Sequence, residues 1–186
     1  SFNDYYAKLN RGAQTINIKD IGPIITKTGM TRDSIIIDAG AGSGGLCCFL
    51  GSIVKRVDTF DVSEKNIEIV KKNIEKLNLE NVNVNLKNIY EPNNFLDSEY
   101  DVFTLDVPEP WNAWKTASKV IKLGGYLVVY SPNVIQVRET IMNKPENFFL
   151  EETIEIIERE WTVSEKISRP KTKDFSHTAF LIFFRK

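Results

Sequence analysis

The chain has 186 residues, 42% of them hydrophobic, which allows one well-buried core and predicts a single domain over residues 1–186. Its 24 Lys and Arg against 25 Asp and Glu give a formal net charge of -1, which excludes a global attraction for nucleic acid, so any such site must be local. No apolar run reaches the roughly 18 residues of a membrane helix, no signal-like segment occurs, and the two cysteines, Cys47 and Cys48, are adjacent. We therefore expect a cytoplasmic protein with reduced, buried thiols.

The predicted elements alternate between strand and helix along most of the chain. Residues 1–30 form a helical lead-in with a helix at 19–28. The elements that follow are strand 34–38, helix 44–54, strand 56–61, helix 64–77, strand 82–86, strand 101–106, helix 111–123, strand 125–130 and helix 134–143. This alternation is typical of an α/β protein with a parallel sheet and helices on both faces.

The end of the chain has a different pattern. Residues 149–163 and 177–184 are long and strand-like, and a basic loop, 166–174, joins them. A terminal hairpin of this kind predicts an antiparallel edge on the sheet.

A glycine-rich loop lies between the first predicted strand and its helix, within residues 36–46. Gly40, Gly42 and Gly45 fit the pattern G-x-G-x-x-G loosely, and Asp61 ends the next strand about 20 residues on, where a ribose hydroxyl would bind. Glycines let the backbone approach a ligand, and the helix start offers unpaired N–H groups. The loop predicts a nucleotide-like cofactor, and the alternative is a tight turn of an ordinary α/β protein.

The acid that precedes the loop distinguishes between cofactors. Asp38 would repel a pyrophosphate. It can instead accept hydrogen bonds from the loop or from the ammonium of a methionine moiety. We therefore expect S-adenosylmethionine and a methyltransferase rather than a dinucleotide and a dehydrogenase, and we expect no metal.

Three further segments carry a more specific resemblance. They are Arg11-Gly12-Ala13-Gln14 followed by Lys19-Asp20, then Leu105-Asp106-Val107-Pro108-Glu109-Pro110-Trp111, and finally Arg169-Pro170 leading to His177-Thr178-Ala179-Phe180-Leu181. With these segments in this order, the chain resembles the tRNA adenine-N1 methyltransferases that modify position 58 in the T-loop, from Tyr5 to Arg185. The resemblance implies a Rossmann-like class I methyltransferase fold with a seven-stranded, mostly parallel sheet. It also implies S-adenosylmethionine as donor, tRNA as substrate and, usually, a homotetramer.

The resemblance also implies roles for individual residues. Asp106 corresponds to the catalytic aspartate and Asp61 to the ribose-binding acid. The residues that correspond to the family's cofactor loop are Gln14, Gly40, Gly42, Ser43, Gly44 and Leu46.

The chain departs from the family pattern in three places. Asn17 and Ile18 precede Lys-Asp where the family commonly has Tyr-Pro, so an aromatic contact near the adenine or the cofactor is missing. Asn88 ends the third strand where an acid usually meets the cofactor's adenine, although its amide oxygen can still bond the exocyclic amine. Only residues 1–10 precede Arg11, so we expect the family's small β-rich N-terminal domain to be absent.

Asp106 ends the fourth strand, and open α/β sheets bind ligands at the carboxyl ends of their strands. N1 of adenine attacks with its own lone pair and needs no base, while positive charge passes from sulfur to the purine. A carboxylate beside the exocyclic amine would accept its hydrogen bond and stabilise that charge. The alternative is a cap for the helix near Trp111. Trp111 and Tyr130 are candidates to border the base, with core packing as their alternative.

Charge segregates near the C-terminus, with a net -5 over residues 139–160 and a net +4 over 163–186. Arg169, Lys171 and Lys173 lie in the basic loop and are candidates to contact RNA phosphates, although such a loop can be only a solvated surface. The single histidine, His177, is expected to make a structural hydrogen bond at the start of the last strand.

Two other functions remain open from the sequence. A small-molecule methyltransferase of the precorrin type would share the cofactor half-site, although the segment 106–111 argues against it. A catalytically weak subunit that only binds RNA or a sister subunit is the second. The intact glycine loop, Asp61 and Asp106 argue against this degenerate form, whereas Ile18 and Asn88 leave it open.

Overall fold

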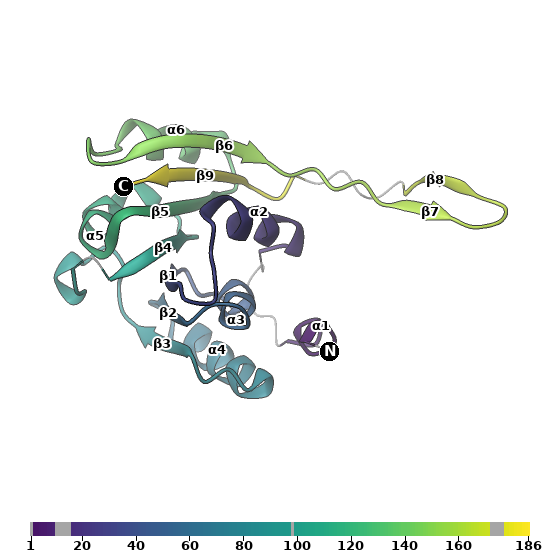
Figure 1. Cartoon of the computed structure of the whole chain (residues 1–186), viewed down its shortest axis with the longest axis horizontal. Helices are drawn as coiled ribbons and strands as arrows, with labels where there is room; N and C mark the ends of the chain where they lie inside the picture. The colour runs from purple at the N-terminus through teal and green to yellow at the C-terminus, as the bar shows by residue number, and fades with distance from the viewer. Residues whose placement is uncertain (1, 10–15, 98, 172–176) are drawn as a thin grey trace.

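Seven strands form one mixed sheet at the centre of the protein. The computed structural model describes residues 2–9, 16–97, 99–171 and 177–186. The strand order is β3-β2-β1-β4-β5-β9-β6 (Figure 1). The parallel strands are β1 (Ile35–Ala39), β2 (Arg56–Asp61), β3 (Val82–Leu86), β4 (Tyr100–Leu105) and β5 (Ile121–Ser131). Strand β9 (Phe180–Arg185) pairs antiparallel with both β5 and β6 (Phe149–Glu155), which confirms the predicted mostly parallel, seven-stranded sheet.

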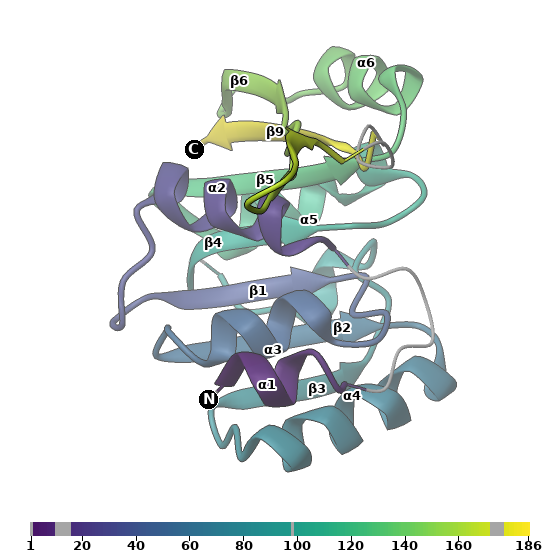
Figure 2. The same cartoon turned by 90° about the vertical axis from the view of Figure 1, so that its right-hand side faces the viewer.

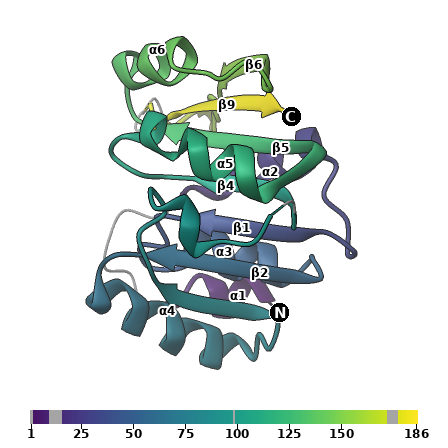
Figure 3. The same cartoon turned by 90° about the vertical axis from the view of Figure 1, so that its left-hand side faces the viewer.

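Helices cover both faces of this sheet. One face carries α1 (Phe2–Tyr6), α2 (Ile18–Thr28), α3 (Gly45–Gly51) and α4 (Glu64–Leu77) (Figure 2). The other carries α5 (Trp114–Val120) and α6 (Val134–Met142), with the 3₁₀ turns η1 (Pro92–Asn94) and η2 (Pro110–Ala113) (Figure 3). Each layer encloses its own apolar core, so the sheet is buried on both faces, as parallel sheets require.

Helix α4 shows how local sequence sets an element. Ser63 lies at its N-cap and accepts a hydrogen bond from the Asn66 N–H, and Asn78 ends it in the left-handed conformation at φ 53°. Ile67 and Val70 are buried and three residues apart, so they lie on the same face. The helix begins and ends at the predicted residues, 64 and 77.

The helix predicted over residues 111–123 is wrong at both ends. Its first residues belong to the turn η2, and α5 ends at Val120 because Ile121 already pairs with Tyr100 at the start of β5. The register of this pair then shifts before Val102. A Cβ at Gly125 would lie 2.8 Å from the Asp101 carbonyl oxygen, so the irregular strand passes β4 closely only because glycine is there.

The C-terminal segments form two separate pairs rather than one long hairpin. The antiparallel edge is present, but β9 runs between β5 and β6, so β6 is the edge strand. The strand predicted over 149–163 ends at Glu155, because the partner strand begins at Phe180, directly opposite. Strands β7 (Trp161–Val163) and β8 (Ser168–Pro170) pair with each other in a projection that we call the arm, residues 157–171 (Figure 1).

Candidate active site

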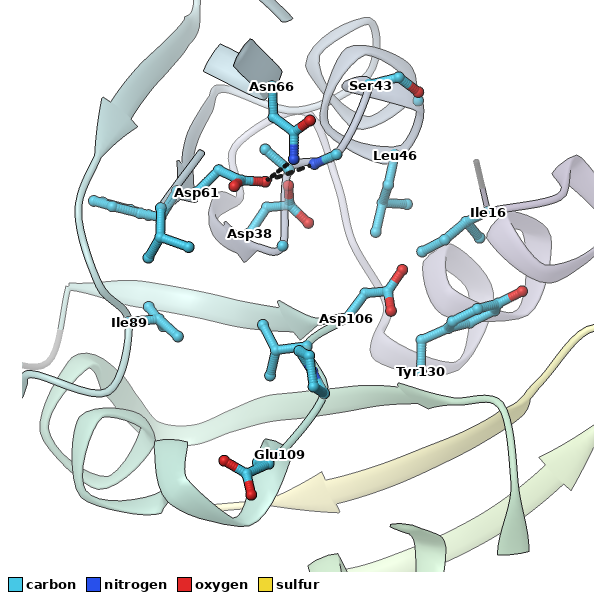
Figure 4. Close-up of a pocket in the computed structure, with 18 of the residues that line it drawn as sticks. Ile16, Asp38, Ser43, Leu46, Asp61, Asn66, Ile89, Asp106, Glu109 and Tyr130 are labelled. Atoms are coloured by element: carbon cyan, nitrogen blue, oxygen red, sulfur yellow. Dashed lines mark hydrogen bonds between the residues drawn. The ribbon is translucent and has the colours of Figure 1, made fainter. Parts of the chain in front are cut away.

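A cavity of about 680 Å³ lies at the carboxyl ends of β1, β2 and β4. The strand order reverses at β1, with β2 and β3 on one side and β4 and β5 on the other. Open α/β sheets bind ligands at such a switch point, and the volume is typical of a small-molecule site. Figure 4 shows Asp38, Asp61 and Asp106 around this cavity.

At the start of the glycine loop, two segments of the backbone pass close to each other. The Gly40 and Ala41 N–H groups donate to the Phe60 carbonyl at 3.0 and 3.1 Å, and the Asp106 N–H donates to the Ala39 carbonyl at 2.9 Å. A Cβ on Gly40 would lie 1.8 Å from the Asp106 carbonyl oxygen, and Gly40 has a φ of 83°. Only glycine therefore allows the loop and the end of β4 to meet beside the cavity.

The rest of the loop divides between cavity wall and support. Gly42, Ser43 and Leu46 line the cavity, together with Gly45. Gly44 is not among the described lining residues; it caps α3 with a φ of 82° and lies against Val70. Gln14 lies outside the described residues.

Asp61 lines the cavity and also holds the loop. Its Oδ2 accepts hydrogen bonds from the Gly42 N–H at 2.9 Å and from the Asn66 amide at 3.1 Å (Figure 4). Its Oδ1 accepts from the Ser63 N–H at 2.8 Å. A carboxylate has about four lone-pair sites, so Asp61 keeps acceptor capacity for a further donor. Asn88 also lines the cavity, although its Oδ1 already accepts from the Tyr90 N–H at 3.0 Å.

Asp38 lies deeper than the sequence alone suggests. Its two carboxylate oxygens accept hydrogen bonds from the hydroxyls of Thr59 at 2.6 Å and Thr104 at 2.8 Å, on the strands to either side. Burial raises the pKa of Asp38, although these two hydrogen bonds act to lower it. The expected hydrogen bonds from the loop are not among its contacts in the structure, so Asp38 faces the cavity as a carboxyl group already held by the sheet.

Among the carboxyl groups that line the cavity, Asp106 accepts the fewest hydrogen bonds from the described residues. It points inward between Asp38 and Tyr130 (Figure 4), and no described group donates a hydrogen bond to its side chain. Burial, and secondarily the Asp38 carboxylate, raise the pKa of Asp106 to about 7. The η2 turn lacks a side-chain cap, so the capping alternative for Asp106 is wrong.

The two aromatic candidates lie in different places. Tyr130 lines the cavity, and burial together with the Asp20 carboxylate raises the pKa of Tyr130 to about 12. Trp111, in η2, packs against the apolar core and is not among the described residues that line the cavity. The neighbouring Trp114 is buried and donates its indole N–H to the Thr140 carbonyl at 3.2 Å.

The basic candidates lie away from the cavity. Arg169 is on β8 and Lys171 follows it, where Lys171 pairs with Glu160 at the arm (Figure 1). Ser168–Pro170 is thus a strand rather than part of a loop. Lys173 lies outside the described residues. The described part of the chain contains no helix both long and apolar enough to cross a membrane, and no group of three potential metal ligands.

Several cavity residues are not evident from local sequence. Thr178 and Ile16 both line it, and Thr178 is joined to the helix α2 by Lys19 and Asp20. The segments that hold Lys19, Asp20 and Thr178 carry the family resemblance, which was the available signal, but nothing in their spacing shows that they meet. His177 makes the expected structural hydrogen bonds, to Glu155 and to the Pro132 carbonyl.

Comparisons with known proteins agree with this geometry. The family described as "tRNA methyltransferase complex GCD14 subunit" matches residues 5–167. The chain is 30% identical to the tRNA (adenine(57)-N(1)/adenine(58)-N(1))-methyltransferase TrmI of Methanocaldococcus jannaschii, over 98% of this chain and 75% of that protein. The crystal structure of tRNA (m1A58) methyltransferase TrmI from Aquifex aeolicus matches with a TM-score of 0.91 at 27% identity, over 100% of this chain and 76% of that one.

A shorter match concerns the small-molecule alternative. A probable cobalt-precorrin-6B C(15)-methyltransferase of Methanobrevibacter smithii is 35% identical over 56 residues, which is 30% of this chain and 30% of that protein. Of the two sequence matches, the one that spans the chain is therefore the match to a tRNA methyltransferase.

Proposed function

Since the chain belongs to the GCD14 family of tRNA methyltransferase complex subunits, we propose that it transfers a methyl group from S-adenosylmethionine to N1 of an adenine in the T-loop of tRNA. The observation that carries the proposal is the Asp106 carboxyl group. It follows directly after β4 beside the glycine loop, points into the cavity and receives no hydrogen bond from the described residues. A buried carboxylate left with free acceptors beside a cofactor loop suits a substrate that brings its own donor.

The charges around the cavity support a cationic cofactor. Asp38, Asp61, Asp106 and Glu109 line it, and Lys87 is the single Lys or Arg among its described lining residues. A pyrophosphate would face these acids, whereas S-adenosylmethionine carries a sulfonium and an ammonium. Gly42 and Ser43 would contact the methionine part, and Asp61 would accept hydrogen bonds from the ribose hydroxyls.

Methyl transfer of this kind asks the protein for position and charge rather than for a base. When bound, S-adenosylmethionine supplies an electrophilic methyl group, and the adenine supplies the N1 lone pair. Asp106 would accept a hydrogen bond from the exocyclic amine and stabilise the positive charge as it passes to the purine. Leu46 and Ile16 form an apolar wall that excludes water (Figure 4). His177, outside the cavity lining, has no part in this step.

The arm supports two further parts of the proposal. Its bases, Arg169 and Lys171 among them, would contact the phosphate backbone of tRNA in the cytoplasm. It also exposes Trp161 and Val163 on an isolated two-stranded sheet, which is marginal by itself, and Ile157 on the segment that leads to that sheet. We therefore propose a homo-oligomer, a tetramer by family resemblance, whose mass light scattering would measure.

One experiment tests the function and separates its rivals. The protein is incubated with S-adenosylmethionine labelled in the methyl group and with unmodified tRNA, and the RNA is digested to nucleosides. We expect label in 1-methyladenosine and none with Asp106→Asn. Cofactor binding without label in RNA would overturn the proposal in favour of a small-molecule methyltransferase, and tRNA binding without cofactor binding would favour a degenerate RNA-binding subunit.

A further inference from the structure

A buried ion pair lies directly behind one wall of the cavity. Lys19 and Asp20 are in the first turn of α2, and the Lys19 Nζ lies 2.7 Å from Asp20 Oδ1. Their side chains are only 9% and 1% exposed. Neither residue lines the cavity, so neither belongs to the cofactor and acceptor contacts described above.

This pair binds two residues that do line the cavity. Lys19 Nζ donates to the Thr178 hydroxyl at 2.6 Å, and that hydroxyl donates to Asp20 Oδ2 at 2.8 Å. The Tyr130 hydroxyl lies 3.5 Å from the same carboxylate oxygen, at the outer limit of a hydrogen bond. Tyr130 lies across Asp106 from Asp38 (Figure 4), on the side of the cavity away from the glycine loop.

Lys19 has a third acceptor, in the segment that follows β6. Lys19 Nζ donates to the Ile156 carbonyl at 2.7 Å, immediately after β6 ends. Its three donors are thus shared among Asp20, Thr178 and Ile156, so its ammonium is fully satisfied although it is buried. The Lys19 side chain therefore connects α2, the end of β6 and the segment before β9.

Stability alone is a poor reason for this arrangement. A buried ion pair loses about as much free energy by desolvation as its charges recover, and well-packed apolar residues are often as stable. What the pair does supply is geometry, because its hydrogen bonds fix Thr178 and orient the Tyr130 hydroxyl. The part of the molecule that it fixes is the cavity wall next to Asp106.

We propose that Lys19 and Asp20 are positioning residues for methyl transfer, and that they hold Thr178 and Tyr130 as the wall against which the acceptor base is placed. The inference rests on the proposed function. In-line displacement depends steeply on alignment, and a shift of about 1 Å can cost roughly a hundredfold in rate. Because the pair makes no hydrogen bond to residues 40–46 of the glycine loop, its loss leaves cofactor affinity unchanged and lowers turnover.

The test compares single-turnover methylation of tRNA by the protein and its variants. Rates are expressed per cofactor-binding site, which is titrated by calorimetry, so that unfolded protein does not contribute. Lys19→Met should lower this rate about tenfold or more, with the S-adenosylmethionine affinity unchanged. The matched control is Lys27→Met, on the same helix, since Lys27 forms only an exposed pair with Glu152 and does not line the cavity.

A double-mutant cycle shows whether the pair acts through Thr178. Thr178→Val removes the hydroxyl and keeps the shape, whereas Thr178→Ser keeps the hydroxyl and should retain most of the rate. Lys19→Met should slow the Thr178→Val protein little further, because the contact is already lost. The inference would be overturned if the rate loss of the double variant equalled the product of the two single losses. It would also be overturned if the rate per site of Lys19→Met equalled the parent's. If Lys19→Met does not fold, Asp20→Asn takes its place in the cycle.

A second measurement needs no RNA. With S-adenosylmethionine bound, backbone amide exchange over residues 129–132 and 177–180 should be faster in Lys19→Met than in the parent and in Lys27→Met. Unchanged exchange there would show that the pair does not hold the wall. A parent protein that fails to methylate tRNA would remove the proposed function, and the exchange result would still decide whether Lys19 positions Tyr130 and Thr178.

Discussion

At the scale of single residues, Asp61 performs two tasks with one carboxylate. It accepts the Gly42 N–H and so fixes the glycine loop, and it lines the cavity where the ribose of the cofactor would lie. Its contacts with Ser63 and Asn66 couple the same group to the start of α4. A substitution here therefore tests both the loop and the ribose contact.

Asp61→Ala should weaken S-adenosylmethionine binding tenfold or more, because a hydrogen bond to a charged acceptor contributes roughly 1.5 to 3 kcal/mol. Calorimetric titration of both proteins checks this. Asp61→Asn is the matched control, since its amide oxygen can still accept from Gly42 and should give an intermediate affinity. Equal affinities for Asp61→Ala and parent would show that the ribose assignment is wrong.

Asp106→Asn should lower turnover on tRNA by a factor on the order of 10² or more, because the amide keeps the shape but removes the negative charge that faces the purine. Cofactor affinity should change little. Single-turnover rates at saturating cofactor are the measurement. An unaltered rate would leave Asp106 without the proposed catalytic role.

Asp106→Asn should also make the folded protein more stable than the parent as pH rises. The pKa of Asp106 is raised from 3.8 to about 7, so the folded protein holds this proton between those values while the unfolded chain has lost it. The contribution of the protonated Asp106 to the free energy of unfolding is full below the unfolded pKa and is lost as pH rises through 7. Melting temperatures of cofactor-free protein should therefore show Asp106→Asn gaining on the parent from about pH 5 to about pH 8. A pH-independent gap would contradict the buried carboxyl.

At the scale of elements, the arm is a two-stranded sheet separate from the central seven-stranded sheet. Strands β7 and β8 pair only with each other, and Trp161 and Val163 are exposed. Arg159 lies over the Trp161 ring at 5.8 Å, an arrangement of base and aromatic residue that also suits RNA. The arm leaves the body next to Ile156, which Lys19 fixes beside the cavity wall.

Replacing Lys166, Arg169, Lys171 and Lys173 together with alanine should weaken tRNA binding most at low salt. Each lost phosphate contact should reduce the slope of log affinity against log salt by about 0.7 to 0.9. Filter binding across a salt series measures this, with cofactor affinity as the internal control, which should not change. An identical affinity and slope would mean that the basic segment is only a solvated surface.

At the scale of the whole molecule, His177 joins three segments of the sheet's edge. Its Nδ1 lies 2.5 Å from Glu155 Oε1 at the end of β6, and its Nε2 lies 2.9 Å from the Pro132 carbonyl after β5. Both partners offer acceptor oxygens, so the protonated ring, with an N–H donor on each nitrogen, suits the two contacts best. The hydrogen bond to Glu155, then that to Pro132, raises the pKa of His177, while Lys19 acts to lower it.

This contact predicts a pH-dependent stability on the alkaline side. The folded pKa lies above the ordinary 6.5, so the contribution is fully present below that value and is lost as pH rises through the folded pKa. The difference in melting temperature between the parent and His177→Gln should be largest below the ordinary pKa of 6.5 and should shrink as pH rises above it. Because the ring is exposed, we expect a small amplitude; a difference that does not vary with pH would contradict the imidazolium.

The sequence by itself determined the order and type of most elements. Apolar spacing and turn residues act over a few positions, so α4 and β3 lie at their predicted bounds and the glycine loop lies between β1 and α3. The places of Asp61 and Asp106 at strand ends follow from the same local pattern. The alternation of strand and helix then fixed the parallel sheet and brought these ends to one edge.

Only the tertiary structure decided which distant residues meet. The threonines that hold Asp38 are 21 and 66 positions away, and Thr178 is 159 positions from Lys19. Helix α5 ends early because Ile121 pairs with β4, and β9 lies between β5 and β6. Such contacts depend on strand pairing and side-chain packing across the whole chain, which the spacing of neighbouring residues does not encode.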